Sequence, residues 1–212
     1  KDGTNSWIYR YAASAEMIQD QQADVIGLQE ALPDQVEFVE KNFRDYKPAG
    51  DTTAIFWNKK TVALQKSGKS AYGTWALIKE KKTGKRFYFV NTHLDHKGTQ
   101  AQANGLKLIV DRIDSINPEG YPMVLTGDFN IKPNNPALVD LDSRMQSTRK
   151  IAAKTDNHNT FNGWSTAKTD AVIDYIYVSG FSACPEYKTV TEKYADKPFV
   201  SDHYPVYARL VF

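Results

Sequence analysis

The sequence predicts a mixed α/β protein in which strands predominate and helices separate some of them. Three observations predict this class: short apolar runs typical of strands recur along the chain, helical patterns lie between several of these runs, and two runs are joined by a short charged turn. A turn of this kind connects antiparallel strands. The pattern therefore favours a mixed sheet, or two packed sheets, over a fully parallel sheet.

Amphipathic helices are predicted at residues 11–22 and Pro33–Asn42, and a third is predicted after Thr99, with a buried face that reaches Ile116. The second has Pro33 in its first turn, where the missing N–H of proline costs nothing. The third begins with Thr99 and Gln102, which we expect to form a capping box. Apolar side chains three and four residues apart mark the buried face of each helix. These faces comprise Ala12, Ala15, Met17 and Ile18 in the first helix, Val36, Val39 and Phe43 in the second, and Leu106, Ile109, Val110, Ile113 and Ile116 in the third.

Strands are predicted at residues 25–28, 54–57, 61–64, 74–79, 86–91, 123–126, 172–178 and 204–212. The charged residues at 82–85 separate two of these runs and predict the hairpin turn. The long polar segment 143–159 is expected to form a loop at the ends of the strands, where substrate sites are usually built.

Composition indicates one folded domain covering residues 1–212. Hydrophobic residues make up 41% and charged residues 25% of the chain, which allows a sizeable core and argues against global disorder. The formal net charge of +2 is too small to indicate non-specific binding of nucleic acid.

The lone Cys184 excludes an intramolecular disulfide and a zinc site built from several thiolates, and we interpret it as a small buried hydrophobe. No apolar run approaches the roughly 18 residues that a membrane-spanning helix needs. The chain begins with Lys1 rather than Met, which we interpret as removal of a preceding segment. The sequence itself contains no targeting signal.

Polar clusters lie at the rims of apolar strands, and each contains a group able to bind a metal or transfer a proton. A single such group means little, because turns favour Asp and Asn. Several together predict one site. The clusters are Gln29-Glu30, Asn91-Thr92-His93, Gly127-Asp128-Phe129-Asn130, Asp174 and Ser201-Asp202-His203.

These residue types match the needs of phosphoester hydrolysis, which are an in-line water, neutralised phosphate oxygens and a stabilised leaving oxygen. Mg²⁺ prefers oxygen ligands and typically takes only one or two carboxylates, so Glu30 and Asp202 would suffice. His203 would contact the phosphate or transfer a proton, with Asp174 fixing its tautomer. The structural alternative is a buried Asp174 that only satisfies backbone donors.

Asp128 and Asn130 stand two residues apart, so an extended backbone points both toward one face. Asp128 would then orient or deprotonate water, and Asn130 would donate to a phosphate oxygen. We expect His93 to help hold the phosphate. A weaker interpretation combines His93 with Asp95 and His96 in a transition-metal site, for which no further histidine lies close in sequence.

In this order along the chain, the clusters resemble the motifs of the endonuclease/exonuclease/phosphatase superfamily. That superfamily includes deoxyribonuclease I, apurinic/apyrimidinic endonucleases, neutral sphingomyelinases, inositol polyphosphate phosphatases and polyA deadenylases. The resemblance spans residues 5–212. It implies a four-layered α/β sandwich, in which two mixed, mainly antiparallel β-sheets pack face to face with helices outside. It also implies a divalent cofactor, Mg²⁺, with Mn²⁺ as an alternative.

The resemblance also implies roles for individual positions. Glu30 resembles the metal-binding Glu of the family and Asp202 the acidic residue near that metal. His203 resembles the catalytic His, with Asp174 as its orienting partner. Family members use either a His of the His203 type or an Asp of the Asp128 type as general base, and that choice stays open.

Three further positions are carried over in the same way. Asp128 and Asn130 match the pair that positions the attacking water and the phosphate, and His93 matches a phosphate-contacting position. Candidate substrate contacts are Trp7, Arg10, Asn91 and Trp164.

The opening Asp2-Gly3-Thr4-Asn5-Ser6-Trp7, together with Arg10, resembles a bacterial branch of the superfamily. In that branch a first strand ending in a metal-binding Asn precedes this segment, and the sequence here lacks it. The stretch 67–74 is also shorter than in those relatives, which implies a reduced substrate rim. The branch is consistent with a secreted or periplasmic location.

The expected function is therefore a divalent-metal-dependent hydrolase of phosphoester bonds, in which water attacks phosphorus. The expected substrate is a nucleic acid, a phospholipid or a sugar phosphate, and the chain is expected to be a monomer. The alternative function is a non-catalytic binding module that retains the fold.

Overall fold

The structure is a computed structural model that describes residues 3–212. Lys1 and Asp2 lie outside the described residues, and Asp2 is the first residue of the opening motif. Its largest sheet has six strands in the order β4-β5-β6-β7-β9-β8. β6 and β7 run parallel, and every other neighbouring pair is antiparallel. The bounds are β4 (Val62–Ser70), β5 (Gly73–Glu80), β6 (Arg86–His93), β7 (Met123–Asp128), β8 (Gln146–Ser147) and β9 (Asp174–Ser179).

A second layer of strands consists of two antiparallel pieces. One has the order β1-β3-β2 and the other pairs β10 with β11. Among residues 3–212, β1 pairs only with β3 and β11 only with β10. The expected absence of a first family strand stays a prediction. The bounds are β1 (Val25–Gly27), β2 (Tyr46–Ala49), β3 (Ile55–Asn58), β10 (Ala183–Thr189) and β11 (Val206–Val211).

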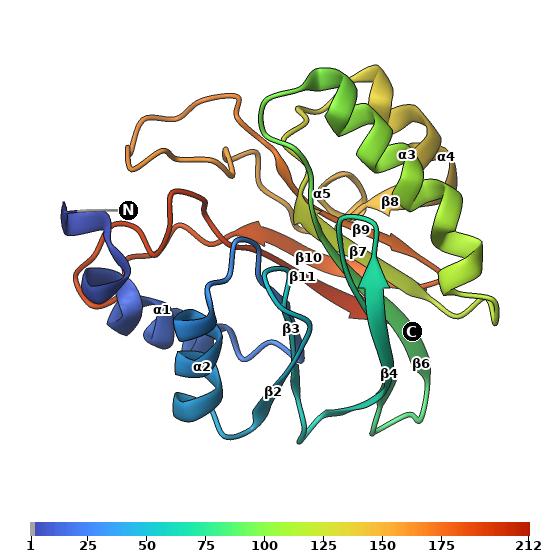
Figure 1. Ribbon diagram of the computed structural model, residues 1–212, viewed down its shortest axis with the longest axis horizontal. Helices are drawn as coiled ribbons and strands as arrows, with labels where there is room; N and C mark the ends of the chain where they lie inside the picture. Colours follow the sequence, from blue (N-terminus) through green and yellow to red (C-terminus); the bar gives the residue numbers. More distant parts are fainter. Residues whose placement is uncertain (1–2) are drawn as a thin grey trace.

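Helices cover the outer faces of both layers, as Figure 1 shows with α3 and α4 on one side of the strands and α1 and α2 on the other. α3 provides the crossover between the parallel strands β6 and β7. No helix of the described chain is long and apolar enough to cross a membrane. The bounds are α1 (Trp7–Gln21), α2 (Pro33–Asn42), α3 (Thr99–Ile116), α4 (Val139–Arg144) and α5 (Thr148–Ile151), with short 3₁₀ turns η1 (Gly3–Asn5) and η2 (Pro136–Leu138).

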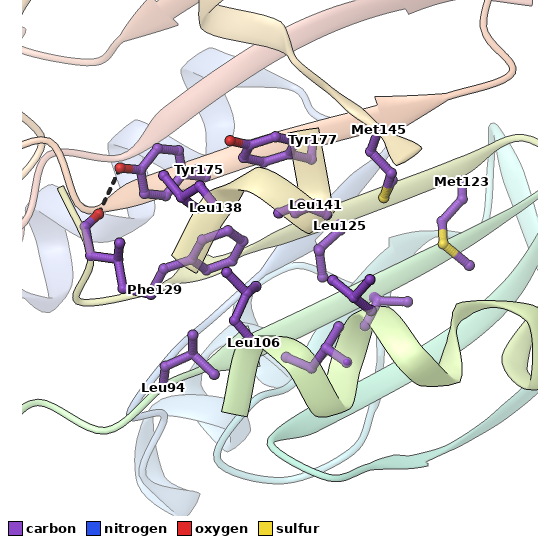
Figure 2. Close-up of a cluster of buried hydrophobic side chains, with 14 of the residues drawn as sticks. Leu94, Leu106, Met123, Leu125, Phe129, Leu138, Leu141, Met145, Tyr175 and Tyr177 are labelled. Carbon is purple, nitrogen blue, oxygen red and sulfur yellow. Dashed lines mark hydrogen bonds between the residues drawn. The ribbon is translucent and has the colours of Figure 1, made fainter. Parts of the chain in front are cut away.

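Apolar side chains that point alternately to the two faces of the six-stranded sheet build the core on both of its sides. In β9, Tyr175 and Tyr177 join the cluster under α3 and α4 (Figure 2), whereas Ile176 and Val178 join the cluster between the two strand layers. Successive side chains of a strand point to opposite faces, so a strand buried on both sides reads as a continuous apolar run. A third cluster packs α1 and α2 against β2 and β3. The molecule is therefore the four-layered α/β sandwich that the sequence predicts.

Several local predictions are corrected by the structure. The capping box at Thr99 is wrong: Gly98 is the N-cap of α3, and no side chain caps it. The predicted loop 143–159 contains β8 and α5, and β4 extends six residues beyond the predicted end at 64, to Ser70. The hairpin turn is confirmed, because the Gly84 N–H donates to the Glu80 carbonyl. Cys184 is buried, as predicted.

Candidate active site

The central strands bring three predicted site residues to one end of the six-stranded sheet. His93 ends β6, Asp128 ends β7 and Asp174 begins β9. His93 pairs in register with Asp128, and Asp128 with Asp174. Residues an even number of positions away on the same strands belong to the cluster between the strand layers, so all three lie on that face of the sheet. The site therefore opens between the two layers at one end of the sandwich.

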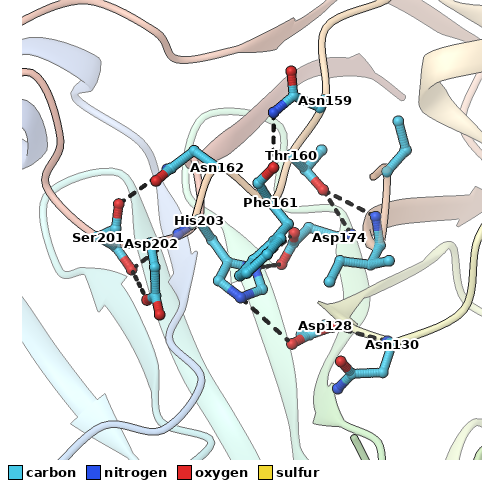
Figure 3. A network of polar contacts seen from close by, with 12 residues as sticks. Asp128, Asn130, Asn159, Thr160, Phe161, Asn162, Asp174, Ser201, Asp202 and His203 are labelled. Atoms are coloured by element: carbon cyan, nitrogen blue, oxygen red, sulfur yellow. Dashed lines mark hydrogen bonds and ion pairs between the residues drawn. The ribbon is translucent and has the colours of Figure 1, made fainter. Parts of the chain in front are cut away.

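His203 reaches this sheet end from the segment before β11, and Figure 3 shows its imidazole between two carboxylates. Its Nδ1 lies 3.0 and 2.9 Å from the two oxygens of Asp174, and its Nε2 lies 3.9 Å from Oδ2 of Asp128. Burial by itself lowers the pKa of His203, but the hydrogen bond and charge of Asp174, with Asp128 and Asp202, raise it to about 9. Asp174 thus orients the ring and leaves Nε2 facing the site.

Asp128 is buried next to a second carboxylate. Burial and the charge of Asp174 raise the pKa of Asp128 well above its usual range, against the opposing charge of His203. Its Oδ1 accepts the backbone N–H of Asn130 at 2.8 Å. Like charges opposite each other on neighbouring strands destabilise a sheet, so this pairing is retained at a local cost in stability.

Asn130 and His93 flank Asp128 from two sides. The backbone of Asn130 is left-handed, with φ of 52°, and its side-chain amide donates to the Leu94 carbonyl at 3.0 Å, which fixes the amide beside the site. His93 Nε2 lies 3.6 Å from Asp128 Oδ2 and 3.7 Å from Glu30 Oε1. Burial lowers the pKa of His93, partly offset by the charge of Glu30.

Glu30 and Asp202, the predicted metal ligands, come from the second strand layer. Glu30 follows β1 with a left-handed backbone, φ 53°, and its side chain is 79% exposed at the mouth of the site. Asp202 is half-buried, and its Oδ1 accepts the Ser201 hydroxyl at 3.3 Å. Its backbone carbonyl accepts the N–H groups of Asn162 and Gly163, at 2.8 and 3.0 Å.

Three residues that hold Asp174 and His203 in place were missed in the sequence. The Thr160 hydroxyl accepts the backbone N–H of Asp174 at 3.1 Å, and Asn162 Nδ2 donates to the Ser201 carbonyl at 3.0 Å. The Phe161 ring lies edge-on to the His203 imidazole, with centroids 5.0 Å apart. All three belong to the polar segment after α5, and no local pattern connects that segment with residues 174 or 203.

Asn91, predicted to contact substrate, is fully buried and joins the two strand layers. Its Nδ2 donates to the Leu28 and Ala54 carbonyls at 2.7 and 3.1 Å. Its Oδ1 accepts from Gln29 Nε2 at 2.6 Å and from the Thr126 hydroxyl at 3.1 Å. Four hydrogen bonds use the full capacity of the amide, which argues against direct contact with substrate. Asn91 instead fixes the end of β1, just before Glu30.

The remaining predicted contacts, Trp7, Arg10 and Trp164, lie together beside the segment that carries Asp202. The Arg10 guanidinium lies 5.8 Å from the Trp7 ring centroid and 5.3 Å from that of Trp164. It also donates to the backbone carbonyls of Asn5 and Val200. Burial lowers the pKa of Arg10, opposed by the charge of Asp202.

The donor atoms of the site fit a hard divalent cation. Asp128, Asp174 and His203 each offer a ligand atom, and these atoms lie within 4.8 Å of one another. Carboxylate oxygens are the ligands that Mg²⁺ and Mn²⁺ prefer. Because His203 Nδ1 is already bonded to Asp174, this group suits proton transfer, and Glu30 and Asp202 are the carboxylates at its border.

The weaker transition-metal interpretation finds no support in the geometry. Asp95 Oδ1 accepts the backbone N–H groups of Lys97 and Gly98, both at 2.8 Å, so this carboxylate caps a turn. His96 is exposed. Within residues 3–212, the metal-competent group is the one formed by Asp128, Asp174 and His203.

The chain was compared with known proteins. Residues 3–203 match the model of the Endonuclease/Exonuclease/phosphatase family. No curated protein matches the chain. A mannosyl-6-phosphatase from Bacteroides thetaiotaomicron has a TM-score of 0.89 and 23% identity, and the match covers 100% of this chain and 96% of that chain.

Two further solved structures extend the comparison. An endonuclease/exonuclease/phosphatase from Bacteroides vulgatus is 27% identical with a TM-score of 0.87, covering 99% of this chain and 92% of that one. TDP2 of D. rerio, solved with a single-strand DNA product, is 18% identical with a TM-score of 0.79, covering 94% and 90%. These structures share the fold described above, and the family model spans nearly the whole chain. The chain therefore belongs to the endonuclease/exonuclease/phosphatase family.

Proposed function

We propose that this protein is a divalent-metal-dependent phosphoester hydrolase in which water attacks phosphorus. The observation that carries the proposal is the convergence of His203, Asp174 and Asp128 at one sheet end, with His203 Nδ1 2.9 Å from Asp174 and Nε2 facing Asp128. Family membership supports hydrolase chemistry, and the oxygen-rich donor set supports a metal cofactor.

In this proposal Asp174 holds His203 in one tautomer, so that Nε2 points at the phosphate. Asp128 and His203 face each other, and one of them accepts the proton of the attacking water. Asn130 and His93 donate hydrogen bonds to the non-bridging oxygens of the phosphate. Each of these groups is fixed by a second contact described above, which keeps the reacting atoms oriented.

Glu30 and Asp202 are the proposed ligands of Mg²⁺, with Mn²⁺ as a substitute. When bound, the ion would neutralise charge on the phosphate and polarise its oxygens. Asn91 places Glu30 by bonding Gln29 and the carbonyl of Leu28. We assign Trp7, Arg10 and Trp164 to the border of the substrate site.

The geometry of the site supports hydrolysis of a phosphoester more strongly than it supports any one identity of the leaving alcohol. One structural neighbour is named a mannosyl-6-phosphatase, and another was solved with a single-strand DNA product. Nucleic acids, phospholipids and sugar phosphates therefore all belong in the assay. The panel should contain p-nitrophenyl phosphate, bis-p-nitrophenyl phosphate, single- and double-stranded DNA, RNA, sphingomyelin and hexose phosphates, each with Mg²⁺, Mn²⁺ or a chelator.

The decisive variant is His203→Ala. We expect kcat to fall by about 10²- to 10⁴-fold, because both proton transfer and phosphate contact are lost. His158→Ala is the matched control: this half-buried histidine contacts Tyr204, with ring centroids 5.1 Å apart, and stands outside the catalytic pair. Equal turnover by His203→Ala and the wild type would refute the assignment. Absence of cleavage in every assay, from a folded protein, would favour the non-catalytic binding module.

A further inference from the structure

A polar cleft of about 300 Å³ adjoins the proposed catalytic residues at His93. One wall comes from the loop between β2 and β3, and the other from the hairpin turn between β4 and β5. His93 lines the cleft as well as the catalytic site, so the two spaces border each other at this residue. The residues that line the cleft include Asp51, Thr52, Thr53, Lys69, Ser70 and Tyr72.

The cleft is anchored to the catalytic strands on both sides. The Tyr72 carbonyl accepts the backbone N–H of His93 at 3.0 Å and the Thr92 hydroxyl at 2.7 Å. On the other wall, the Thr52 carbonyl accepts the N–H of Ala31 at 3.0 Å, next to Glu30. A group bound in the cleft would therefore lie beside both His93 and the proposed metal ligand.

The two walls are also joined to each other, which gives the cleft a fixed shape. The hydroxyls of Thr53 and Thr74 are 3.1 Å apart, and Lys69 Nζ lies 2.9 Å from Asp51 Oδ2. The Tyr72 ring packs against α3 at Gly105, where an added Cβ would lie 3.2 Å from the ring. Prearranged walls of this kind bind a ligand without first having to order themselves.

The polar groups of the cleft walls indicate which kind of ligand the cleft can bind. Hydroxyl groups, one cation and one anion line the cleft, and the apolar contribution is Ala71 with the partly exposed ring of Tyr72. A ligand rich in hydroxyl groups would meet donors and acceptors along both walls.

Other substrate classes fit less well. An acyl chain needs an apolar wall, and a single-stranded nucleic acid uses a basic track with several stacking aromatic rings. Here the charge of Lys69 is balanced by Asp51, and the rings in the lining are those of Tyr72 and His93. The volume is at the small end of the range for ligand sites, which suits one sugar ring rather than a polymer.

From this geometry we infer that the cleft binds the alcohol part of the substrate, and that this alcohol is a single polyhydroxylated ring, so that the preferred substrates are sugar phosphates. The inference rests on the proposed hydrolase function and adds the substrate class. Lys69, Asp51 and the cleft hydroxyls would bind sugar hydroxyls, and Tyr72 would pack against the C–H face of the ring. The phosphate would lie past His93.

The test measures selectivity. For the wild type, Tyr72→Ala and Lys69→Ala, kcat/KM is determined for glucose 6-phosphate, mannose 6-phosphate and p-nitrophenyl phosphate, which lacks sugar hydroxyls. We expect the ratio of hexose phosphate to p-nitrophenyl phosphate to fall at least tenfold in each variant. Lys107→Ala is the matched control, because Lys107 forms a similarly exposed ion pair with Asp111, at 2.8 Å, on α3. It should leave the ratio unchanged.

An unchanged ratio in both cleft variants, or a wild type that prefers DNA or sphingomyelin to both hexose phosphates, would overturn the inference. The proposed function fails separately, if folded wild type cleaves none of the phosphoesters. In that event, calorimetry with glucose 6-phosphate and mannose 6-phosphate still decides about the cleft. Saturable binding that Tyr72→Ala weakens at least tenfold supports it, and absence of saturable binding overturns it.

Discussion

At the scale of single residues, His203 and Asp174 form an ion pair whose strength depends on pH. In the absence of metal, the pKa of His203 is raised from 6.5 to about 9 by the contacts with Asp174, Asp128 and Asp202, against the opposing effect of burial. A histidine with a raised pKa in the folded state stabilises the fold fully below its unfolded pKa. That stabilisation is lost as the pH rises through the folded pKa. The relevant window is therefore about pH 6.5 to 9.

The raised pKa of His203 predicts how the stability of chelator-treated protein depends on pH. We expect the melting temperature to fall between pH 6.5 and 9 in the wild type. The fall should be shallower in Asp174→Asn, because the amide no longer favours the imidazolium. Thermal denaturation at fixed ionic strength measures both slopes. Parallel slopes in the two proteins would show that the charge of His203 contributes nothing to folding.

At the scale of elements, Arg10 connects α1 to the segment that carries His203. It donates to the Val200 carbonyl, 190 positions away in the sequence and just before Ser201-Asp202-His203. The guanidinium also lies over the Trp7 and Trp164 rings. From these contacts we propose that Arg10 positions this segment, and the predicted substrate contact stays a prediction.

Kinetics distinguish these two roles. If Arg10 positions the segment, Arg10→Ala should lower kcat by roughly 10- to 100-fold with little change in KM, since small misplacements of a catalytic group are costly. Arg10→Lys should not restore activity, because an ammonium group cannot reproduce the planar fork. Arg144, whose Nη1 donates to the Val110 carbonyl at 3.1 Å between α4 and α3, provides a control substitution to Ala. A rise in KM alone would instead show direct substrate contact.

The elements also show what the sequence could predict. The bounds of α2 and the buried face of α3 were predicted because their apolar stripes are regular, and α2 begins at a proline. β2 and β10 were missed because Pro48 and Pro185 lie within them. Proline is tolerated at sheet edges and irregularities: β2 is an edge strand, and the β10–β11 register shifts between Ala183 and Glu186, around Pro185. The start of β9 was placed two residues early, since Val172 and Ile173 continue the apolar run without joining the ladder.

For the site, local sequence predicted which residues converge but not what holds them. Asp174 and His203 were paired from their chemistry, because a carboxylate in an apolar strand needs a partner. The supports of that pair, Thr160 and Asn162, come from another loop and act through hydrogen bonds to backbone groups near positions 174 and 203. Asn91 was assigned to substrate because its motif borders the site, and only its burial and four bonds reveal a role between the layers.

At the scale of the whole molecule, the proposed metal ligands come from two pieces of the second layer. Glu30 follows β1 and Asp202 precedes β11, and β1 and β11 belong to pieces that do not pair with each other in residues 3–212. A cation held by both carboxylates would tie these pieces together. Because the complete site exists only in the folded chain, binding the cation would also stabilise the fold.

The link between cation binding and folding predicts how far the metal should raise the melting temperature. A ligand at 100 times its Kd stabilises the folded state by about 2.7 kcal/mol, which corresponds to roughly 5–10 °C in melting temperature for a chain of this length. We expect Mg²⁺ titrated into chelator-treated protein to produce such a rise. Glu30→Gln should remove most of it while leaving the metal-free melting temperature almost unchanged, because the Glu30 side chain is 79% exposed. Differential scanning fluorimetry measures both quantities without relying on activity.

Glu37→Gln is the matched control, since Glu37 is an exposed residue of α2 whose ion pair with Lys41 lies outside the site. It should retain the full response to Mg²⁺. A rise as large in Glu30→Gln as in the wild type would contradict the assignment of Glu30 as a ligand. The group formed by Asp128, Asp174 and His203 would then become the candidate, and Asp128→Asn would be expected to abolish the rise. Those residues all border the six-stranded sheet. Loss of the Mg²⁺ response in Glu30→Gln would therefore indicate a metal that joins the two pieces of the second layer. Loss in Asp128→Asn instead would indicate a metal that neutralises carboxylates of the six-stranded sheet.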